Sequence, residues 1–334
     1  MEQVKKGVTI ISSGSAKVTQ VLDNHDLSKI VDTSDDWIKT RTGIRKRHIA
    51  DVHSLCDLAS QAAQKAIVNA SLTPADIDMI ILATSTPDDL FGSASKIQGM
   101  IGATKAVAFD LTAACSGFVF ALITASQFIR NGVYENIVVI GADCLSRWVD
   151  WSDRTTCVLF GDGAGAVVCQ ASEFGDRLLG FEMCSNGSLN SALNLAYQGE
   201  IKNIGHHKQI TQGQFGKITM NGREVYRFAV NKVPEVIEKA LFRADLTIEQ
   251  IDWLILHQAN QRIIEAVAER LNIPSWKVIS NLSEYGNTSA ASIPLALDEA
   301  LTHGKIRNGD RIVTSGFGAG LTWGAAIFQW GNLP

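Results

Sequence analysis

An internal repeat constrains the fold of this chain more than any other feature of its sequence. Residues 63–83 resemble residues 237–257 at a constant offset of 174, and the pairs Lys65-Ala66, Leu72-Thr73 and Ile77-Asp78 recur in the second copy. Each copy passes from a helix-like stretch through a short turn into an apolar strand, MIILA in the first and WLILH in the second. Each half of the chain is therefore predicted to contain a helix–turn–strand unit.

Further matches extend the repeat along both halves. Residues 135–139 resemble residues 310–314, and residues 165–168 resemble residues 324–327. Apolar strands that alternate with amphipathic helices are typical of layered α/β proteins. We therefore expect a layered α/β/α/β/α sandwich built from two duplicated halves.

The length of the chain fits this duplicated architecture. With 334 residues, the chain is long enough to bury a core in each half without disulfides or metal. We place the halves at residues 1–175 and 176–334, related by a pseudo-twofold axis, and expect the functional site to lie between them.

The composition excludes several classes of protein. Apolar residues make up 46% and charged residues 19% of the chain, which is typical of a compact globular protein. A net charge of −4 gives no general attraction for nucleic acid, so a polyanionic partner would have to bind a local basic patch. The chain has no apolar run of membrane-spanning length, and its first residues lack the core of a signal peptide. A cytoplasmic protein without membrane or nucleic-acid partners is predicted.

The cysteines and histidines do not suggest a metal site. None of the six cysteines forms a CxxC pair, and their spacing is unlike that of zinc ligands, so we expect reduced thiols at positions 56, 115, 144, 157, 169 and 184. The adjacent His206 and His207 would not share a helical face, which favours a solvated loop.

Cys115 is the strongest candidate nucleophile. It follows an apolar segment and precedes a long apolar helix candidate that starts near Ser116, so it should lie at a helix N-terminus. Unpaired N–H groups and the helix dipole at such a position lower the pKa of a thiol. At an offset of 172 the residue opposite Cys115 is Asn287, which also lies where a small-residue turn becomes a helix. The other cysteines fit the ordinary interpretation of small buried hydrophobic residues.

His257 and Asn287 are the candidate partners of this thiol. His257 ends an apolar strand, and its counterpart in the first half is Ala83, so packing does not require an imidazole at this position. Asn287 could instead serve as a helix cap, a role that is compatible with catalysis.

Several motifs, in the same order along the chain, resemble those of the β-ketoacyl-acyl-carrier-protein synthase III family, which are condensing enzymes with the thiolase fold. These motifs are VDTSDDWI and TRTGI (31–38 and 40–44), AACSGF (113–118), HQAN (257–260), GNTSAAS (286–292) and GFGAGLTWG (316–324). The chain departs from the family pattern at SGSAK (13–17) and in segment 198–218, which is longer than usual. Neither departure affects Cys115, His257 or Asn287.

The resemblance implies an acyltransferase that catalyses the initiating condensation of type II fatty acid biosynthesis. Cys115 would take an acyl group, typically acetyl, from coenzyme A and pass it to the carbanion formed when malonyl-acyl-carrier protein loses CO₂. His257 and Asn287 would donate hydrogen bonds to the thioester oxygen of the enolate, and the N–H groups of Cys115 and Ala319 would form a second oxyanion hole. Coenzyme A would be a substrate, and no cofactor or metal would be needed.

The resemblance also implies binding residues. Trp37 and Arg154 would enclose the adenine of coenzyme A, with Arg41 nearby. Basic side chains that would receive the acidic carrier protein, although each could also be an ordinary solvated arginine, are Arg227, Arg262 and Arg270.

A homodimer is a further implication of the resemblance. Phe91 would reach across the interface and close the acyl pocket of the partner subunit, where Leu145 and Phe160 would also limit the space.

Two other interpretations remain open from the sequence. A quinolone, polyketide or hydroxymethylglutaryl synthase could use the same fold and residues, although the segment from Trp37 to Arg41 and the presence of Asn287 argue against the last of these. A non-catalytic partner subunit that only binds acyl carrier protein is a different class, but such subunits lack the nucleophile that Cys115 provides.

Overall fold

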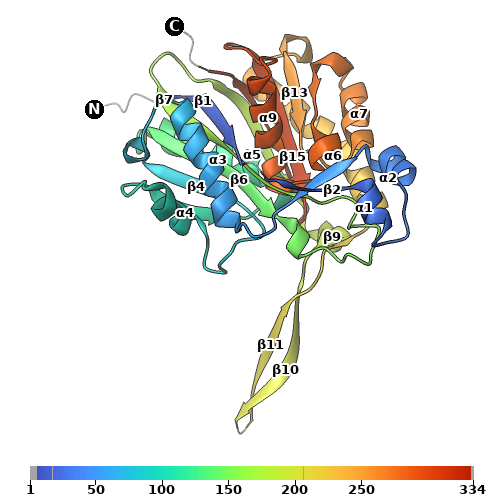
Figure 1. Ribbon diagram of the computed structural model, residues 1–334. Coiled ribbons are helices and arrows are strands. Elements are labelled where there is room, and N and C mark those ends of the chain that lie inside the picture. The colour runs from blue at the N-terminus through green and yellow to red at the C-terminus, as the bar shows by residue number, and fades with distance from the viewer. Residues whose placement is uncertain (1–5, 17, 206, 332–334) are drawn as a thin grey trace.

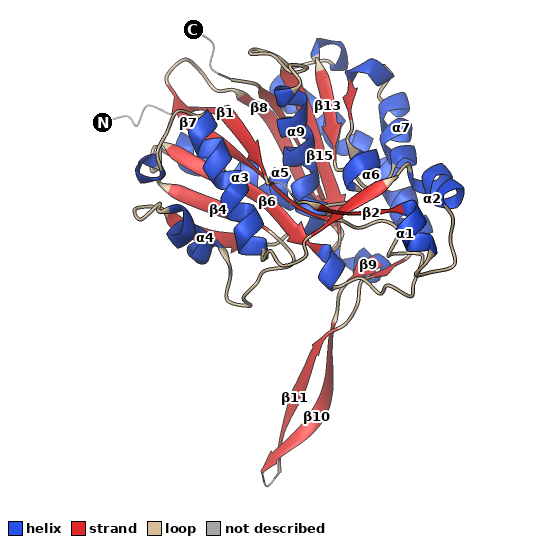
Figure 2. Cartoon of the chain, viewed as in Figure 1, coloured by secondary structure: helices blue, strands red, loops and turns tan. Residues whose placement is uncertain are grey.

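The computed structural model of the chain describes residues 6–16, 18–205 and 207–331, and it contains two five-stranded sheets (Figure 2). The strands of the first sheet, in spatial order, are β1 (Gly7–Ser15), β7 (Asp162–Ser172), β6 (Asn136–Cys144), β4 (Met79–Ala83) and β5 (Val107–Leu111). In this sheet β4 is parallel to both β5 and β6, whereas β7 runs antiparallel to β6 and to β1.

The second sheet repeats the order and direction of the first. Its strands, in spatial order, are β14 (Val278–Ile279), β13 (Trp253–Leu256), β15 (Arg311–Gly318), β16 (Thr322–Gln329) and β8 (Leu178–Ser185). Strand β13 is parallel to β14 and β15, and β16 runs antiparallel to β15 and β8. The repeated segments of the sequence therefore occupy equivalent strands, and the predicted duplicated fold is confirmed.

Helices form the layers between and outside the sheets (Figure 1). The central helices α5 (Gly117–Arg130) and α9 (Ser292–Thr302) pack against strands of both sheets. The first sheet is covered on its outer side by α3 (Leu55–Asn69) and α4 (Ala94–Ile101), and the second by α6 (Gly222–Ala244) and α7 (Gln261–Arg270). The result is the five-layered α/β/α/β/α arrangement.

The sequence explains why these helices form where they do. Helix α3 begins with a capping box in which Ser54 and Asp57 satisfy each other's backbone N–H groups. The central helix α5 has no charged residue before Arg130, because both of its sides face a sheet. Helix α6 begins at the N-cap Asn221, whose side chain accepts a hydrogen bond from the N–H of Glu224.

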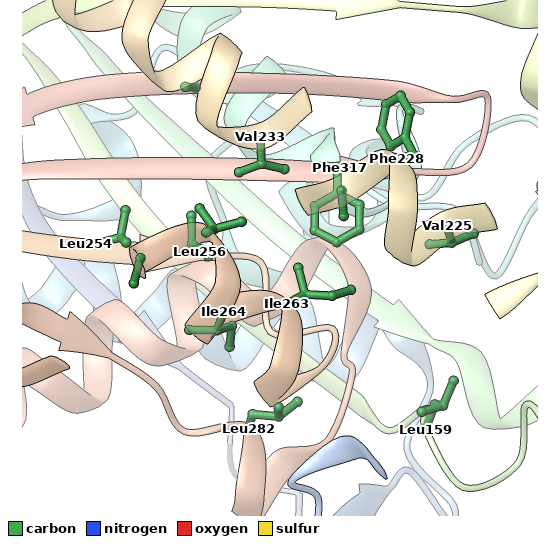
Figure 3. Close-up of a cluster of buried hydrophobic side chains, with 14 of the residues drawn as sticks. Leu159, Val225, Phe228, Val233, Leu254, Leu256, Ile263, Ile264, Leu282 and Phe317 are labelled. Carbon is green, nitrogen blue, oxygen red and sulfur yellow. The ribbon is translucent and has the colours of Figure 1, made fainter. Parts of the chain in front are cut away.

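Apolar packing holds the outer helices on the second sheet. Side chains of α6, α7 and β13 share one buried cluster, in which Val233, Leu256 and Phe317 converge (Figure 3). Leu256 is the last residue of β13, and Phe317 lies near the end of β15. This packing fixes the ends of the two strands on which candidate site residues lie.

Short elements complete the chain. They are α1 (Asn24–Ser28), α2 (Asp35–Thr42) and α8 (Leu282–Tyr285), the strand pair β2 (Gln20–Asp23) and β3 (Lys46–Ile49), and the pair β9 (Leu193–Asn194) and β12 (Thr219–Met220). No helix in the described part of the chain is long and apolar enough to cross a membrane.

Segment 198–218, which was expected to be longer than usual, forms most of a projecting hairpin. Its strands β10 (Tyr197–Gly205) and β11 (Lys208–Phe215) extend away from the body of the molecule (Figure 1), and all of their described residues are exposed. At its base, the ring of Phe215 contacts the rings of Tyr197 and Trp148 at centroid distances of 5.9 and 6.4 Å. Beyond this aromatic contact the hairpin adds nothing to the buried core.

Candidate active site

Cys115 lies in a tight turn between β5 and α5. Residues Ala114–Ser116 form a single 3₁₀ turn, with Ala114 in the left-handed region at φ +47°. The turn packs directly on β15, since a Cβ added to Gly318 would lie only 2.7 Å from the backbone nitrogen of Cys115. A glycine is therefore required at position 318 for the turn Ala114–Ser116 to pack this closely on the second sheet.

The expected lowering of the Cys115 pKa is not what the structure indicates. Helix α5 begins only at Gly117, and the thiol lies in the preceding turn with 6% of the residue exposed. Burial raises the pKa of the thiol to about 12, and a hydrogen bond with the Ser289 side chain only partly opposes this effect. Burial therefore favours the protonated thiol, so attack by the sulfur requires the loss of its proton.

His257 follows the last residue of β13 and is 2% exposed. Its Nδ1 lies 2.8 Å from the hydroxyl oxygen of Ser292, which also accepts a hydrogen bond from the N–H of Gln258. The hydroxyl can accept from this N–H and still donate its own proton to Nδ1 of His257, and this is the arrangement that we assign. The imidazole proton then resides on Nε2. Burial lowers the pKa of His257 to about 3, so the ring is neutral at ordinary pH.

Asn287 is fixed at both its backbone and its side chain. Its N–H donates to the carbonyl of Leu159, and its carbonyl accepts from the N–H of Gly161. The side-chain Oδ1 accepts a hydrogen bond of 2.9 Å from the N–H of Ser289. Because this bond occupies the amide oxygen, the Nδ2 group is the part of the side chain that can donate to a ligand.

The three residues meet through short connections between the two halves. Ser289 bonds to Asn287 through its backbone N–H, and the turn Ser289–Ala291 contacts the turn Ala114–Ser116 that holds Cys115. His257 packs edge-on against Phe317, at a centroid distance of 5.4 Å, and the next residue of β15 is the Gly318 that touches Cys115. Ala319 follows directly in the chain. The arrangement joins a buried thiol to two neutral hydrogen-bond donors.

Sequence reasoning missed three polar residues of this site. Ser292 and Ser289 are buried hydroxyls in the segment that follows Asn287, and Asp143 is a fully buried carboxyl near the end of β6. The available signal for Asp143 was a single acidic residue in an otherwise apolar strand. The two serines carried a weaker signal, because small hydroxyl residues are common where turns become helices.

Asp143 accepts an unusual number of hydrogen bonds. Its Oδ1 accepts from the N–H of Ser85 at 2.8 Å and from the hydroxyls of Thr84 and Thr86 at 3.2 and 3.0 Å. Its Oδ2 accepts from the N–H of Ala290 at 3.2 Å. Burial raises the pKa of Asp143 in spite of these donors.

The candidate adenine-binding residues lie together. The guanidinium of Arg41 lies 4.9 Å and that of Arg154 lies 5.3 Å from the centroid of the Trp37 ring. Arg154 is exposed and also donates a hydrogen bond to the carbonyl of Asp32. An aromatic base that entered between Trp37 and Arg154 would have to displace this guanidinium.

The candidate carrier-protein arginines are exposed on two neighbouring helices, with Arg227 on α6 and both Arg262 and Arg270 on α7. Arg262 stacks over the ring of Tyr226, whereas Arg270 donates to the carbonyl oxygens of Val230 and Asn231. The arginines thus differ in how freely they can bind a partner.

The candidate acyl-pocket residues are only partly brought together. Leu145 and Phe160 belong to one buried cluster, and Phe160 is bridged to Asn287 through the backbone. Phe91 is 99% exposed on the loop before α4 and does not contribute to that cluster.

Among the described residues, no group of three or more histidine, cysteine or acidic side chains is arranged to hold a metal ion. The six cysteines are free thiols. His207 is exposed near the tip of the projecting hairpin, and His206 lies outside the described residues.

Two family models match the chain. The model described as 3-oxoacyl-[acyl-carrier-protein (ACP)] synthase III matches residues 109–187, which include Cys115. The model for the C-terminal part of the same family matches residues 241–330, which include His257 and Asn287.

Known proteins resemble the chain over nearly its whole length. A β-ketoacyl-[acyl-carrier-protein] synthase III of Nostoc sp. is 67% identical over 98% of this chain and 99% of its own. The crystal structure of 3-oxoacyl-[acyl-carrier-protein] synthase III from Aquifex aeolicus is 47% identical, with a TM-score of 0.90 over 97% of this chain and 100% of the other. The priming β-ketosynthase of the R1128 polyketide pathway is 30% identical, with a TM-score of 0.91 over 100% of this chain and 99% of the other.

Proposed function

The chain belongs to the β-ketoacyl-acyl-carrier-protein synthase III family, and we propose that Cys115, His257 and Asn287 carry out the reaction of this family. The enzyme condenses an acyl-coenzyme A primer with malonyl-acyl-carrier protein, giving a 3-ketoacyl-acyl-carrier protein, coenzyme A and CO₂. This reaction initiates fatty acid synthesis. The observation that carries the assignment of roles is that one buried thiol after β5 and two buried neutral donors, one after β13 and one after α8, lie at the junction of the two halves.

In the first half-reaction the sulfur of Cys115 attacks the thioester carbonyl of the primer. A bond forms between this sulfur and the acyl carbon, while the S–H bond of Cys115 and the bond from the acyl carbon to the sulfur of coenzyme A break. The departing coenzyme A thiolate gains a proton, so the thiol proton is balanced. The N–H groups of Cys115 and Ala319 stabilise the negative oxygen of the tetrahedral intermediate, because backbone donors at this elbow are fixed before the substrate arrives. Acetyl is the proposed primer.

In the second half-reaction malonyl-acyl-carrier protein loses CO₂ and leaves an enolate. Nε2–H of His257 and Nδ2–H of Asn287 donate to its oxygen, and each such donor typically contributes about 10²–10³ in rate. Neighbouring groups direct these two N–H groups towards the enolate. The Ser292 hydroxyl occupies Nδ1 of His257. The N–H of Ser289 occupies Oδ1 of Asn287. The carbanion attacks the acyl carbon, and the thiolate of Cys115 leaves and is protonated again.

Substrate contacts outside the junction are proposed as follows. The adenine of coenzyme A binds at Trp37, Arg154 and Arg41, where cationic groups already lie over the indole. The acidic carrier protein binds the arginine face of α6 and α7, which consists of Arg227, Arg262 and Arg270.

We further propose a homodimer in which Phe91 closes the acyl pocket of the partner subunit beside Leu145 and Phe160. A fully exposed phenylalanine supports this proposal, because soluble monomers seldom leave large aromatic rings uncovered. The proposed halves remain residues 1–175 and 176–334; the first sheet ends at Ser172 and the second begins at Leu178. The absence of a cofactor and the cytoplasmic location remain predictions from the sequence.

Separate measurement of the two half-reactions tests the assigned roles. Acyl-enzyme formation is followed by intact-protein mass spectrometry after incubation with acetyl-coenzyme A, and decarboxylation is followed as CO₂ released from malonyl-acyl-carrier protein. Cys115→Ser should form no acyl-enzyme, because a serine hydroxyl is almost wholly protonated. His257→Ala and Asn287→Ala should form it but release little CO₂. Acylation of the Cys115→Ser protein at another residue, or normal CO₂ release by both other variants, would contradict the assignment.

A non-catalytic carrier-protein-binding subunit is excluded by the same experiment if acyl-enzyme forms at Cys115. A related synthase that uses another acceptor would form the acyl-enzyme but would not release CO₂ from malonyl-acyl-carrier protein.

A further inference from the structure

Arg47 is a buried cation that the proposed reaction does not use. It lies on β3, is 0% exposed, and has the largest fully buried side chain among the described residues. Burial lowers its pKa only to about 10, so the guanidinium stays charged at neutral pH. Burial of a charge is costly, and an apolar side chain of similar volume would fill the same space at a lower cost. A cation at this position therefore calls for a reason beyond packing.

The guanidinium of Arg47 bridges two segments that are far apart in the sequence. Its Nη1 donates to Oδ1 of Asn24 at 2.6 Å, and its Nη2 donates to the carbonyl of Val158. Because a guanidinium is planar and can only donate, it holds both acceptors in a fixed geometry. An ammonium group is a single point charge on a flexible stem and would not fix two acceptors in the same way.

Asn24 connects this bridge to helix α2. Its Nδ2 donates to Oδ1 of Asp35 at 2.8 Å and to the carbonyl of Ile44 at 2.9 Å. Asp35 is the first residue of α2, and Ile44 follows the C-cap of the same helix. Asn24 is 2% exposed, so water does not compete for these bonds. One side of the bridge is therefore anchored at both ends of α2.

The other side of the bridge supports the backbone of Asn287. The residue after Val158 is Leu159, whose carbonyl accepts from the N–H of Asn287 at 2.9 Å. The N–H of Gly161 donates to the carbonyl of Asn287 at 3.0 Å. Both backbone groups of Asn287 are thus paired with the segment that Arg47 holds at Val158.

The aliphatic part of Arg47 lies beside these backbone bonds. A Cβ added to Gly161 would lie 3.2 Å from Cβ of Arg47, and one added to Gly286 would lie 3.4 Å from its Cγ. The arginine therefore packs against the segment 159–161 and also against the residue that precedes Asn287. Removal of its side chain would free both segments that fix the position of Asn287.

We propose that Arg47 is a positioning residue for the decarboxylation step, in which it acts through Asn287. By holding the segment 158–161, Arg47 keeps the Nδ2 donor of Asn287 where the enolate oxygen develops its charge. A donor stabilises such charge best when its geometry is fixed before the reaction. Arg47 does not touch the substrate, and none of its bonds is made or broken. The inference rests on the proposed role of Asn287.

The test is a double-mutant cycle on CO₂ release from radiolabelled malonyl-acyl-carrier protein. The cycle compares wild type, Arg47→Lys, Asn287→Ala and the double variant. With Asn287 present, Arg47→Lys should lower kcat by at least about tenfold, because a misplacement of about 1 Å can reduce a rate by up to about 10²-fold. KM should stay unchanged, since Arg47 is buried. In the Asn287→Ala background the same substitution should change kcat by less than about twofold.

Arg130→Lys is the matched control. Arg130 also bridges a side-chain oxygen, of Asp176, and a carbonyl, of Leu178, but it lies at the last residue of α5. Arg130→Lys should leave kcat unchanged. An undiminished kcat in Arg47→Lys would overturn the proposal. An equal fold-loss with and without Asn287 would also overturn it, because the effect would then be a general loss of structure.

Two further outcomes are distinguishable from these. Normal CO₂ release by Asn287→Ala would contradict the proposed function itself, and the inference with it. If Arg47→Lys does not fold, Asn24→Ala replaces it in both backgrounds, because it removes the acceptor of Nη1 and leaves the bond of Arg47 to Val158. Asn24→Ala should lower kcat only when Asn287 is present, and an equal loss in both backgrounds would overturn the proposal.

Discussion

The Nδ1 atom of His257 lies 2.8 Å from the hydroxyl oxygen of Ser292, and this contact joins the end of β13 to the first residue of α9. The hydroxyl accepts from the N–H of Gln258 and, in the tautomer assigned above, donates to the imidazole. A serine that makes no proposed contact with substrate thus selects the tautomer that can stabilise an enolate. The same helix begins five residues after Asn287, so one segment of the chain orients both donors.

Ser292→Ala should reduce CO₂ release from malonyl-acyl-carrier protein by roughly 10- to 100-fold, the usual loss when the partner of a functional histidine is removed. The rate of Cys115 acylation should change little, because His257 does not act in that step. The control is Ser126→Ala, which removes a buried hydroxyl of α5 that bonds to the carbonyl of Ile123. Equal CO₂ release by Ser292→Ala and wild type would show that the tautomer is fixed by another contact.

His257 should make folding stability depend on pH. Its pKa falls from 6.5 to about 3 on folding, so between these values the unfolded chain binds a proton that the folded chain does not. Stability is therefore lost as pH falls below about 6.5. Replacement of His257 by Ala should reduce the stability lost between pH 7 and pH 5 by about 2 kcal/mol, at 1.36 kcal/mol per pH unit for one proton. Urea denaturation at both pH values measures this difference, and parallel losses in the two proteins would contradict the assignment.

Phe91→Thr should widen the acyl pocket of the proposed dimer. If Phe91 of the partner subunit fills the pocket end beside Leu145 and Phe160, each added methylene of the primer costs about 1–3 kcal/mol of overpacking, or roughly 5- to 150-fold in discrimination. The variant should shift preference from acetyl- towards butyryl- and octanoyl-coenzyme A, measured as kcat/KM. An unchanged profile would show that a different residue limits chain length.

The three arginines on the exposed face of α6 and α7 should contribute unequally to carrier-protein binding. Arg262→Ala and Arg227→Ala should raise KM for malonyl-acyl-carrier protein severalfold, and the effect should weaken at high salt. Arg270→Ala should matter less, because its guanidinium already bonds to carbonyls of α6.

The control for this surface is Arg243→Ala. This residue lies at the other end of α6 and pairs with Glu182 at 2.6 Å. The substitution removes one positive charge, as Arg227→Ala does, but at a position about 24 Å along α6 from Arg227. If Arg243→Ala raises KM as much as Arg262→Ala does, general charge rather than this face controls binding.

The projecting hairpin should be dispensable for folding. Replacement of residues 199–213 by Asn-Gly retains the Gln198–Gln214 pair and the aromatic contact at the base, and the described residues that it removes are all exposed. Unfolding free energy should change by less than about 1 kcal/mol, because a two-stranded hairpin is marginally stable by itself. Ile255→Ala, at a fully buried position of β13, should cost about 2–5 kcal/mol in the same urea assay. A comparable loss for the shortened protein would show that the hairpin stabilises the body.

The sequence by itself determined the fold and the identity of the candidate nucleophile. The repeat at 63–83 and 237–257 was sufficient to predict a duplicated fold, because equivalent strands need the same apolar pattern. In the structure both copies occupy equivalent positions in the two sheets. His257 was identifiable because packing in the other half accepts Ala83 at the equivalent position, so the imidazole had no structural reason to be there.

Only the tertiary structure decided the protonation states and the partners of these residues. The pKa of Cys115 was expected to be low from its position in the chain, but burial against β15 raises it, and burial depends on the packing of the two halves. Asp143 and Ala290 are 147 residues apart, and no local pattern predicts the hydrogen bond from the N–H of Ala290 to a carboxyl on β6. Local sequence fixes which groups are available, whereas the solvent that each one loses and the neighbour that each one gains depend on how the two sheets meet.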